Sequence, residues 1–362
     1  MAVLQTYQSS AGNREDLIPI ITMISPHDAP FTSSIATKKA TGMTHEWLTD
    51  SLASPALNAQ VEGSDATYGT LTPRVRVQNY IQNIRKTGQI SDNQQAVLKA
   101  GVKDEYAYQL EKATKEIALD TERAFIQGSR SLGTSNTAAT LGGMFYYTTT
   151  NRTNAAAAAP TTGTAVAGAA TTITLAAAAG VANQSYILLT GGTGQGQYRL
   201  ITGLAGAVAT VAAWDIIPDA TTTYSVYVAP AALTETVLNN AFEACYNAGG
   251  SPDCVLAPTA QKRQISGFAS AVRRLTSSEQ SLTNSIDVYE SDFGRHAVKT
   301  NRWMPTGSTA VLERGQYAAA YLRPVKAEEM PRTGSSRKFM IESAVTLESR
   351  AENSSALVLG IA

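Results

Sequence analysis

Hydrophobic and polar positions follow a helical period most clearly from Val102 to Gln127. Apolar side chains recur there every three or four residues, and oppositely charged residues stand four apart. Gly128 follows the last apolar position and is placed to end the helix. A helix of this length is a rod of roughly 40 Å. Because its apolar stripe is modest, the rod is predicted to lie across a surface and not inside a core.

The residues before this rod predict an arm followed by an exposed loop. Residues 13–24 carry an apolar face behind a capping Asn13, and two prolines end that helix. The next stretch, TGMTHEWLTDSLASPALNAQVEGSDATYG, has strand-like ends around a Gly/Ser/Asp middle, which predicts a long exposed loop or hairpin. Residues 71–90 alternate as a strand does, with a slip near Tyr80 that indicates a bulge.

Composition changes abruptly over residues 152–232, which are rich in Ala, Thr and Gly and almost without charge. The tract AAAAAPTTGTAVAG is typical of a linker. Five short apolar runs with glycine turns follow it and predict a small antiparallel β unit. Since mixed sequence resumes afterwards, this unit is predicted to be an insertion.

The rest of the chain mixes helices and strands. Residues 233–250 predict a helix capped by Thr234, DCVLAP a buried strand, and PTAQKRQISGF a second helix. A polar loop at 270–285 precedes a series of strands that runs to the C-terminus. The whole pattern lacks repeated βαβ units, so the predicted fold class is α+β.

The surface chemistry favours self-association. Only 16% of the 362 residues are charged, below the roughly 25% of an average soluble domain. A surface so poor in charge suits a chain that buries much of it against copies of itself. Basic and acidic residues balance at 29 each, so no net field attracts nucleic acid or an anionic membrane. The two cysteines form no CxxC, and neither a signal peptide nor a spanning segment is predicted.

The stretch GGTGQGQYRLITG at residues 191–203 is a candidate ligand loop. A glycine loop that holds phosphate must open into a helix. The residues that follow here are β-rich, so a hairpin turn is predicted, and a nucleotide-binding enzyme using the glycine loop 191–196 remains as an alternative. The three histidines lack metal-ligand spacing and no GxSxG elbow exists. The sequence therefore predicts no enzyme, with no catalytic residue, cofactor or metal site.

Several segments occur in an order that points to a known family. EDLIPIITMISPHDAPFTSSI is similar to an N-terminal arm, THEWLTDSL to the start of an extended loop, and QISDNQQAVLKAGVKDEYAYQLEKATKEIALDTERAFIQG to a spine-helix region. NSIDVYESDFG, NRWMP and AYLRPVKAEEMPRTGSSRKFMIESAVTLESRAENSSALVLG resemble the C-terminal half of the same family. Together they resemble the major capsid proteins of tailed bacteriophages with the Hong Kong ninety-seven type fold, in the SU-ten-like major head protein family.

The resemblance implies a division of the chain. The expected parts are an N-terminal arm (1–45), an extended loop (46–88), a peripheral domain with the spine helix (89–150 and 326–362), an inserted β domain (151–232) and an axial domain (233–325). The polar loop at 270–285 is expected to face the capsomer axis. The inserted domain is expected to project outward from the shell.

The resemblance also implies a function. The expected role is self-assembly into hexamers and pentamers that form the icosahedral head around phage DNA, in a virion capsid assembled in the host bacterial cytoplasm. A separate scaffolding protein, a portal and a decoration protein are further candidate partners. Packaged DNA is expected to make weak non-specific contact only, and no membrane is involved. Another phage structural protein, of tail or decoration type, is the remaining alternative.

Inter-subunit ion pairs are the one residue-level hypothesis. We expect Arg74, Arg76 and Arg85, on or beside the extended loop, to pair with acidic residues of a neighbour's spine helix. The candidate acids are Glu105, Glu116 and Glu122.

Overall fold

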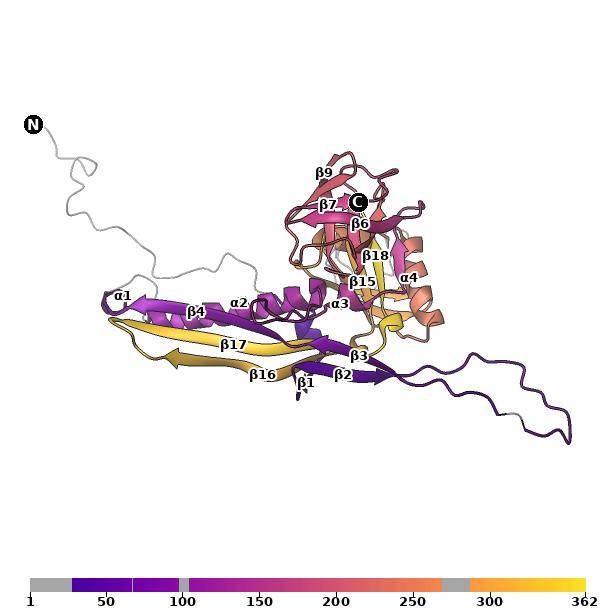
Figure 1. Ribbon diagram of the computed structural model, residues 1–362, viewed down its shortest axis with the longest axis horizontal. Coiled ribbons are helices and arrows are strands. Elements are labelled where there is room, and N and C mark those ends of the chain that lie inside the picture. The colour runs from indigo at the N-terminus through magenta and orange to yellow at the C-terminus, as the bar shows by residue number, and fades with distance from the viewer. Residues whose placement is uncertain (1–27, 67, 98–103, 269–286) are drawn as a thin grey trace, which may run out of the picture.

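The chain forms an elongated layer that carries a rounded body at one end. The computed structural model describes residues 28–66, 68–97, 104–268 and 287–362. Figure 1 shows a long sheet with a helix across it, a thin hairpin that extends beyond the layer, and a barrel above it. The helix predicted at 13–24 and the polar loop at 270–285 lie outside the described residues.

A four-stranded sheet forms the elongated layer, in the order β1-β16-β17-β4. Its strands are β1 (Ala36–Lys39), β16 (Tyr317–Met330), β17 (Ser336–Ser349) and β4 (Gln82–Ser91). The short helix α1 (Asp92–Ala96) follows β4 directly and is capped by the Ser91 side chain. The strands are antiparallel except that β1 runs parallel to β16.

The predicted rod is helix α2 (Glu105–Gln127), which lies across one face of this sheet (Figure 1). It begins at Glu105 because the Asp104 carboxylate accepts hydrogen bonds from the next turn, and residues 98–103 lie outside the described part. Its apolar stripe, including Ile117 and Phe125, packs with Ile341 of β17 in the largest core cluster. The prediction of one apolar stripe resting on a surface is confirmed.

A two-stranded hairpin carries the exposed loop. Strands β2 (Thr44–Thr49) and β3 (Val75–Tyr80) pair antiparallel, and the residues between them reach far beyond the layer (Figure 1). Ile81 separates β3 from β4, so the predicted slip near Tyr80 is the point where the chain passes from the hairpin into the long sheet. Ile81 is fully buried.

The charge-poor insertion is a closed six-stranded barrel in the order β10-β7-β6-β11-β8-β9. Its strands are β6 (Thr161–Ala169), β7 (Thr172–Leu175), β8 (Tyr186–Gly191), β9 (Tyr198–Ala205), β10 (Val208–Val211) and β11 (Thr223–Tyr227). The expectation of a linker over AAAAAPTTGTAVAG is wrong in its second half, because β6 begins at Thr161 and pairs with both β7 and β11. That pairing closes the barrel around its own core, which includes Ile187 and Trp214.

A second sheet, in the order β13-β14-β12-β15-β18-β5, forms the body under the barrel. Its strands are β5 (Arg152–Asn154), β12 (Cys254–Ala257), β13 (Val288–Ser291), β14 (Gly294–Thr300), β15 (Ser308–Leu312) and β18 (Ala356–Leu359). The helices of this part are α3 (Met144–Tyr147), α4 (Glu235–Asn247) and α5 (Thr259–Phe268), with α4 capped by Thr234 as predicted.

Strand membership differs from the predicted domain boundaries in three places. The boundary at 326 falls inside β16. Strand β18 belongs to the second sheet although residues up to 362 were assigned to the peripheral part. Strand β4 pairs along β17 although its first residues were assigned to the extended loop. The physical reason is the same in all three places. Pairing between strands far apart in the sequence decides to which sheet these residues belong, and the local sequence pattern does not show that pairing.

His296 gives the second sheet a predictable pH dependence. Its ring is fully buried, stacks on Phe242 at 3.9 Å, and lies with Nδ1 2.9 Å from the carbonyl of Pro252. Burial lowers the pKa of His296 from its ordinary value of about 6.5, and the hydrogen bond to the Pro252 carbonyl only partly opposes this. Just below pH 6.5 the His296 ring therefore binds a proton in the unfolded chain but stays neutral in the native state.

We expect the free energy of unfolding to fall as the pH drops below about 6.5. Urea unfolding at pH 7.5 and pH 5.5 measures this change, with His296→Gln as the comparison. The wild type should lose more stability between the two pH values than the variant does. An equal loss in both would contradict the assignment to His296.

Candidate functional site

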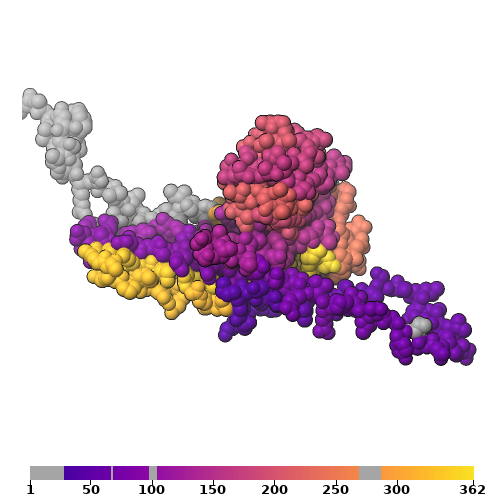
Figure 2. Space-filling view, in the orientation of Figure 1, coloured from indigo at the N-terminus to yellow at the C-terminus, as the bar shows by residue number. Residues whose placement is uncertain are grey.

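The extended loop is the most exposed part of the described chain. Large apolar side chains along it face solvent, with Leu52 at 99%, Leu57 at 96% and Tyr68 at 97% exposure. Residues 50–66 and 68–74, between β2 and β3, form no strand. Figure 2 shows this segment as a narrow arm with solvent on both sides. Since exposed apolar surface of this kind marks a binding site, the loop is a candidate interface.

The base of this loop is fixed to the body by buried polar contacts. Asn79 is fully buried, and its amide nitrogen donates to the carbonyls of Gly142 at 3.0 Å and Leu347 at 2.7 Å. Its Oδ1 accepts from the Gly142 amide at 2.8 Å and from the next residue's amide at 2.9 Å. The Gln78 carbonyl accepts from Arg130 and from the Tyr147 hydroxyl, both at 2.8 Å. The direction of the loop is thus set within one chain.

The three candidate arginines each have an acidic partner in their own chain. Arg74 lies 3.6 Å from Asp50, and Arg76 lies 3.3 Å from Glu46, both across the β2–β3 hairpin. Arg85 lies 3.2 Å from Glu342 on β17. All three arginine side chains are mostly exposed, so these pairs contribute little to folding. The guanidinium groups remain accessible to a neighbouring chain.

Two of the three candidate acids lie on the accessible side of α2. Glu116 is half-exposed and pairs with Lys86 and Lys112. Glu105 lies in the first turn and accepts from Gln109 at 2.8 Å. Both line a groove of about 620 Å³ between α2 and β4, whose floor includes Phe339.

Glu122 is not available to a neighbour, which corrects the hypothesis for this residue. Its carboxylate is fully buried and accepts from the amides of Phe31 at 2.8 Å and Thr32 at 2.7 Å. It also accepts from the Thr32 hydroxyl and from Asn301 Nδ2, both at 2.6 Å. Glu122 therefore joins the N-terminal segment, α2 and the strand end after β14 within one chain.

The glycine run forms a turn and does not have the geometry of a phosphate-binding loop. It joins β8 to β9, so a strand follows where a phosphate site needs a helix. Gly196 has φ +91°, and a Cβ there would lie 2.9 Å from the backbone of Tyr146. The turn therefore fixes the barrel closely against α3. Among the described residues no group of His, Cys, Asp and Glu could hold a metal ion.

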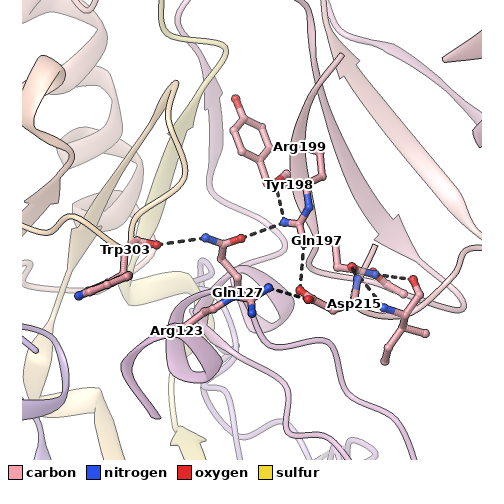
Figure 3. A network of polar contacts seen from close by, with 9 residues as sticks. Arg123, Gln127, Gln197, Tyr198, Arg199, Asp215 and Trp303 are labelled. Carbon is pink, nitrogen blue, oxygen red and sulfur yellow. Dashed lines mark hydrogen bonds and ion pairs between the residues drawn. The ribbon is translucent and has the colours of Figure 1, made fainter. Parts of the chain in front are cut away.

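A buried polar joint connects the barrel to α2 (Figure 3). Arg199 of β9, only 9% exposed, donates to Gln127 at 2.9 Å and to Asp215 at 2.9 Å. Gln127 in turn donates to the Trp303 carbonyl at 3.1 Å. Arg123 reaches the other oxygen of Asp215 at 2.6 Å. Burial lowers the pKa of the Arg199 guanidinium, while Asp215 opposes that shift, so the charged form is retained.

Replacement of Arg199 should loosen this joint. We expect Arg199→Met to lower the free energy of unfolding by about 1.5–3 kcal/mol, because it removes hydrogen bonds from a buried charged donor. The matched control is Arg123→Met, whose exposed side chain contacts the same Asp215 and should cost less than about 1 kcal/mol. Denaturant unfolding measures both. Equal losses in the two variants would contradict the joint as described.

The pattern of the sequence did not reveal Asn79 or the barrel joint. Asn79 sits in an alternating strand, where a polar residue is expected to face solvent. The one available signal for the joint was charge: Arg199 and Asp215 stand among very few charged residues of the insertion. Charge retained in such a segment indicates a specific partner.

The long helix on an elongated sheet, the projecting loop and the second sheet together define a capsid subunit of the Hong Kong ninety-seven type. The fold is similar to that of a chain in the structure titled "Capsid of native GTA particle computed with C5 symmetry". The TM-score is 0.55, and the identity is 11% over 100% of both chains. The structure titled "Phage G gp27 major capsid proteins and gp26 decoration proteins" is also similar, with a TM-score of 0.51 and 9% identity over 100% of both chains.

Sequence comparison identifies the family. The SU10 major capsid protein family matches residues 4–362. The major capsid protein of Escherichia phage Phieco32 is 26% identical over 346 residues, which are 91% of this chain and 89% of that protein. The chain belongs to the SU10 major capsid protein family, and it is a capsid-forming protein of the virion shell. The alternatives of a tail protein, a decoration protein or a nucleotide-binding enzyme are not favoured.

No helix among the described residues combines the length and apolar character needed to cross a membrane.

Proposed function

We propose that this chain assembles into rings of five and six copies that close into an icosahedral head around phage DNA. In each ring the extended loop of one copy lies on α2 of the next. The observation that carries this proposal is the loop itself, whose large apolar side chains, such as Leu52, Leu57 and Tyr68, are almost fully exposed in the single chain. An exposed arm of this kind buries its surface only on another molecule.

The groove between α2 and β4 is the surface that suits this loop. It is lined by residues of both signs, including Lys86, Lys112 and Glu116, with Phe339 between them. Arg74 and Arg76 lie at the loop's base, where they can add ion pairs with α2 acids such as Glu116 as the loop crosses it. A contact from one copy to a different surface of the next is heterologous, and it forms a ring when the rotation between successive copies closes.

The remaining proposals about function rest on family membership. Assembly in the host bacterial cytoplasm, weak non-specific contact with packaged DNA, and binding of a separate scaffolding protein, a portal or a decoration protein are proposed on that basis. An outward position of the barrel is proposed likewise.

Charge reversal tests the loop contact. We expect Arg76→Glu to raise the protein concentration needed for assembly about fivefold, which corresponds to roughly 1 kcal/mol per contact. Light scattering during assembly measures that concentration. The control is Glu46→Gln, which removes the partner of Arg76 within its own chain without adding repulsion. An unchanged concentration for Arg76→Glu would count against the inter-subunit pair.

A further inference from the structure

Strand β16 leaves most of its outer edge without a partner. Strand β1 pairs only with Ala318–Tyr321 at the start of β16. Beyond that point residues 323–330 are all exposed, and no other described strand pairs with their outer side. Figure 1 shows this stretch as the free margin of the long sheet, on the side away from α2. An unpaired edge of this length is a template for another strand.

The edge sequence is complementary to itself in one antiparallel register. It reads Arg-Pro-Val-Lys-Ala-Glu-Glu-Met over residues 323–330. When two copies pair around Ala327, Lys326 of each stands opposite Glu328 of the other. Directly opposed residues lie on the same face of a sheet, so both pairs can form.

Other registers are disfavoured by charge. When a two-fold axis runs perpendicular to the sheet, one residue lies on the axis, directly opposite the same residue of the second copy. The identity of that residue fixes the register. Centring on Lys326, Glu328 or Glu329 places like charges directly opposite each other, which is destabilising. Centring on Val325 avoids this conflict but shortens the paired stretch, because the edge begins at Arg323. Ala327 is therefore the centre that pairs opposite charges over the longest stretch.

We propose that β16 of one copy pairs antiparallel with β16 of a second copy across a two-fold axis at Ala327. The two long sheets then form one continuous sheet. This inference rests on the proposed function and adds to it. The loop contact is heterologous and closes rings, whereas a two-fold contact joins one ring to another. A closed shell needs both kinds of contact.

The isolated chain protects this edge from other partners. Lys326 and Glu328 pair with each other at 2.7 Å and are both well exposed, so they can exchange partners at little cost. Pro324 carries no amide donor and limits the ladder at one end. Register shifts between Tyr321 and Lys326 bend the strand there. These features discourage pairing with unrelated strands.

A mixing experiment tests the contact. Lys326→Glu and Glu328→Lys each place like charges opposite one another, so each alone should raise the concentration needed for closed shells about tenfold. An equimolar mixture of the two variants restores both opposite-charge pairs between unlike copies, so shells should form again. If the residues acted only within one chain, mixing would restore nothing. Failure of the mixture to recover, or normal shells from each variant alone, would overturn the inference.

A cysteine at the axis gives a second readout. Ala327→Cys places two thiols opposite each other at a Cα separation of about 4.5–5.5 Å, within disulfide range. Under mild oxidation, assembled shells of this variant should yield covalent dimers. The control is Val325→Cys, which would stand opposite Glu329 and should yield none. Both native cysteines are buried and do not interfere. Absence of dimers from Ala327→Cys shells, or equal dimers in both variants, would overturn the proposed register.

The experiments distinguish a failure of the β16 contact from a failure of the loop contact. If the β16 contact is wrong but the loop contact is right, both charge variants form closed shells like the wild type. If the loop contact is wrong, Arg76→Glu leaves assembly unchanged whatever the β16 variants do. If the β16 contact is right, each charge variant should stop at separate rings at concentrations where the wild type already forms shells, and electron microscopy distinguishes the two.

Discussion

Excision of residues 52–71, with a short Gly-Ser turn in their place, should abolish closed shells while leaving a folded chain. The excised residues lie beyond the β2–β3 pairing, and those that the structure describes are all exposed. Their loss should therefore change the free energy of unfolding by less than about 0.5 kcal/mol. The excision removes the heterologous contact that is proposed to close each ring. Electron microscopy of the assembly reaction should show neither rings nor shells.

A matched control separates the loop from exposed apolar surface in general. Val166 on the barrel is 60% exposed, and Val166→Ser should assemble normally. The paired variant Leu57→Ser, on the loop, should assemble poorly. Closed shells from the excised chain would contradict the role of the loop, even if their yield were reduced.

The second large effect is expected from Glu122→Ala. The carboxylate accepts four hydrogen bonds from two separate parts of the chain, residues 31–32 and Asn301, and the variant leaves the buried Phe31 amide and Asn301 amide group without an acceptor. Each buried donor left without a partner costs about 1–3 kcal/mol, so the two donors and the lost Thr32 hydrogen bonds together cost about 3–5 kcal/mol. We expect a fall of that size in the free energy of unfolding, measured with denaturant.

The comparison for Glu122 is Glu116→Ala on the same helix. Glu116 is half-exposed and pairs with Lys86 and Lys112, so its loss should cost less than about 1 kcal/mol. A cost for Glu122→Ala as small as that of Glu116→Ala would contradict the buried junction. Normal unfolding with failed assembly would instead favour the inter-subunit role first expected for Glu122.

Local patterns predicted local structure well. The rod of α2, the slip near Tyr80 and the hairpin turn at the glycine run each depend on neighbours a few residues away. The sequence shows those neighbours directly. The cap of α4 at Thr234 is predictable for the same reason.

The features that the sequence did not predict depend on contacts between residues far apart in the chain. Glu122 reads as one acid on an amphipathic helix, and nothing nearby shows that Phe31 and Thr32 lie against it. Strand β6 reads as a linker until β11, more than fifty residues later, pairs with it. The polar role of Asn79 arises because Gly142 and Leu347 meet at its amide group. Contacts of this kind are made by the fold and leave no periodic signal.

The central claim is that each copy extends its loop onto α2 of the next copy in a closed shell. Electron cryomicroscopy of assembled particles, at a resolution that traces the backbone, tests it most directly. The account predicts icosahedral shells of five- and six-membered rings in which residues 50–74 of every copy cross the neighbouring α2. A loop folded back onto its own chain, or particles without such rings, would contradict it.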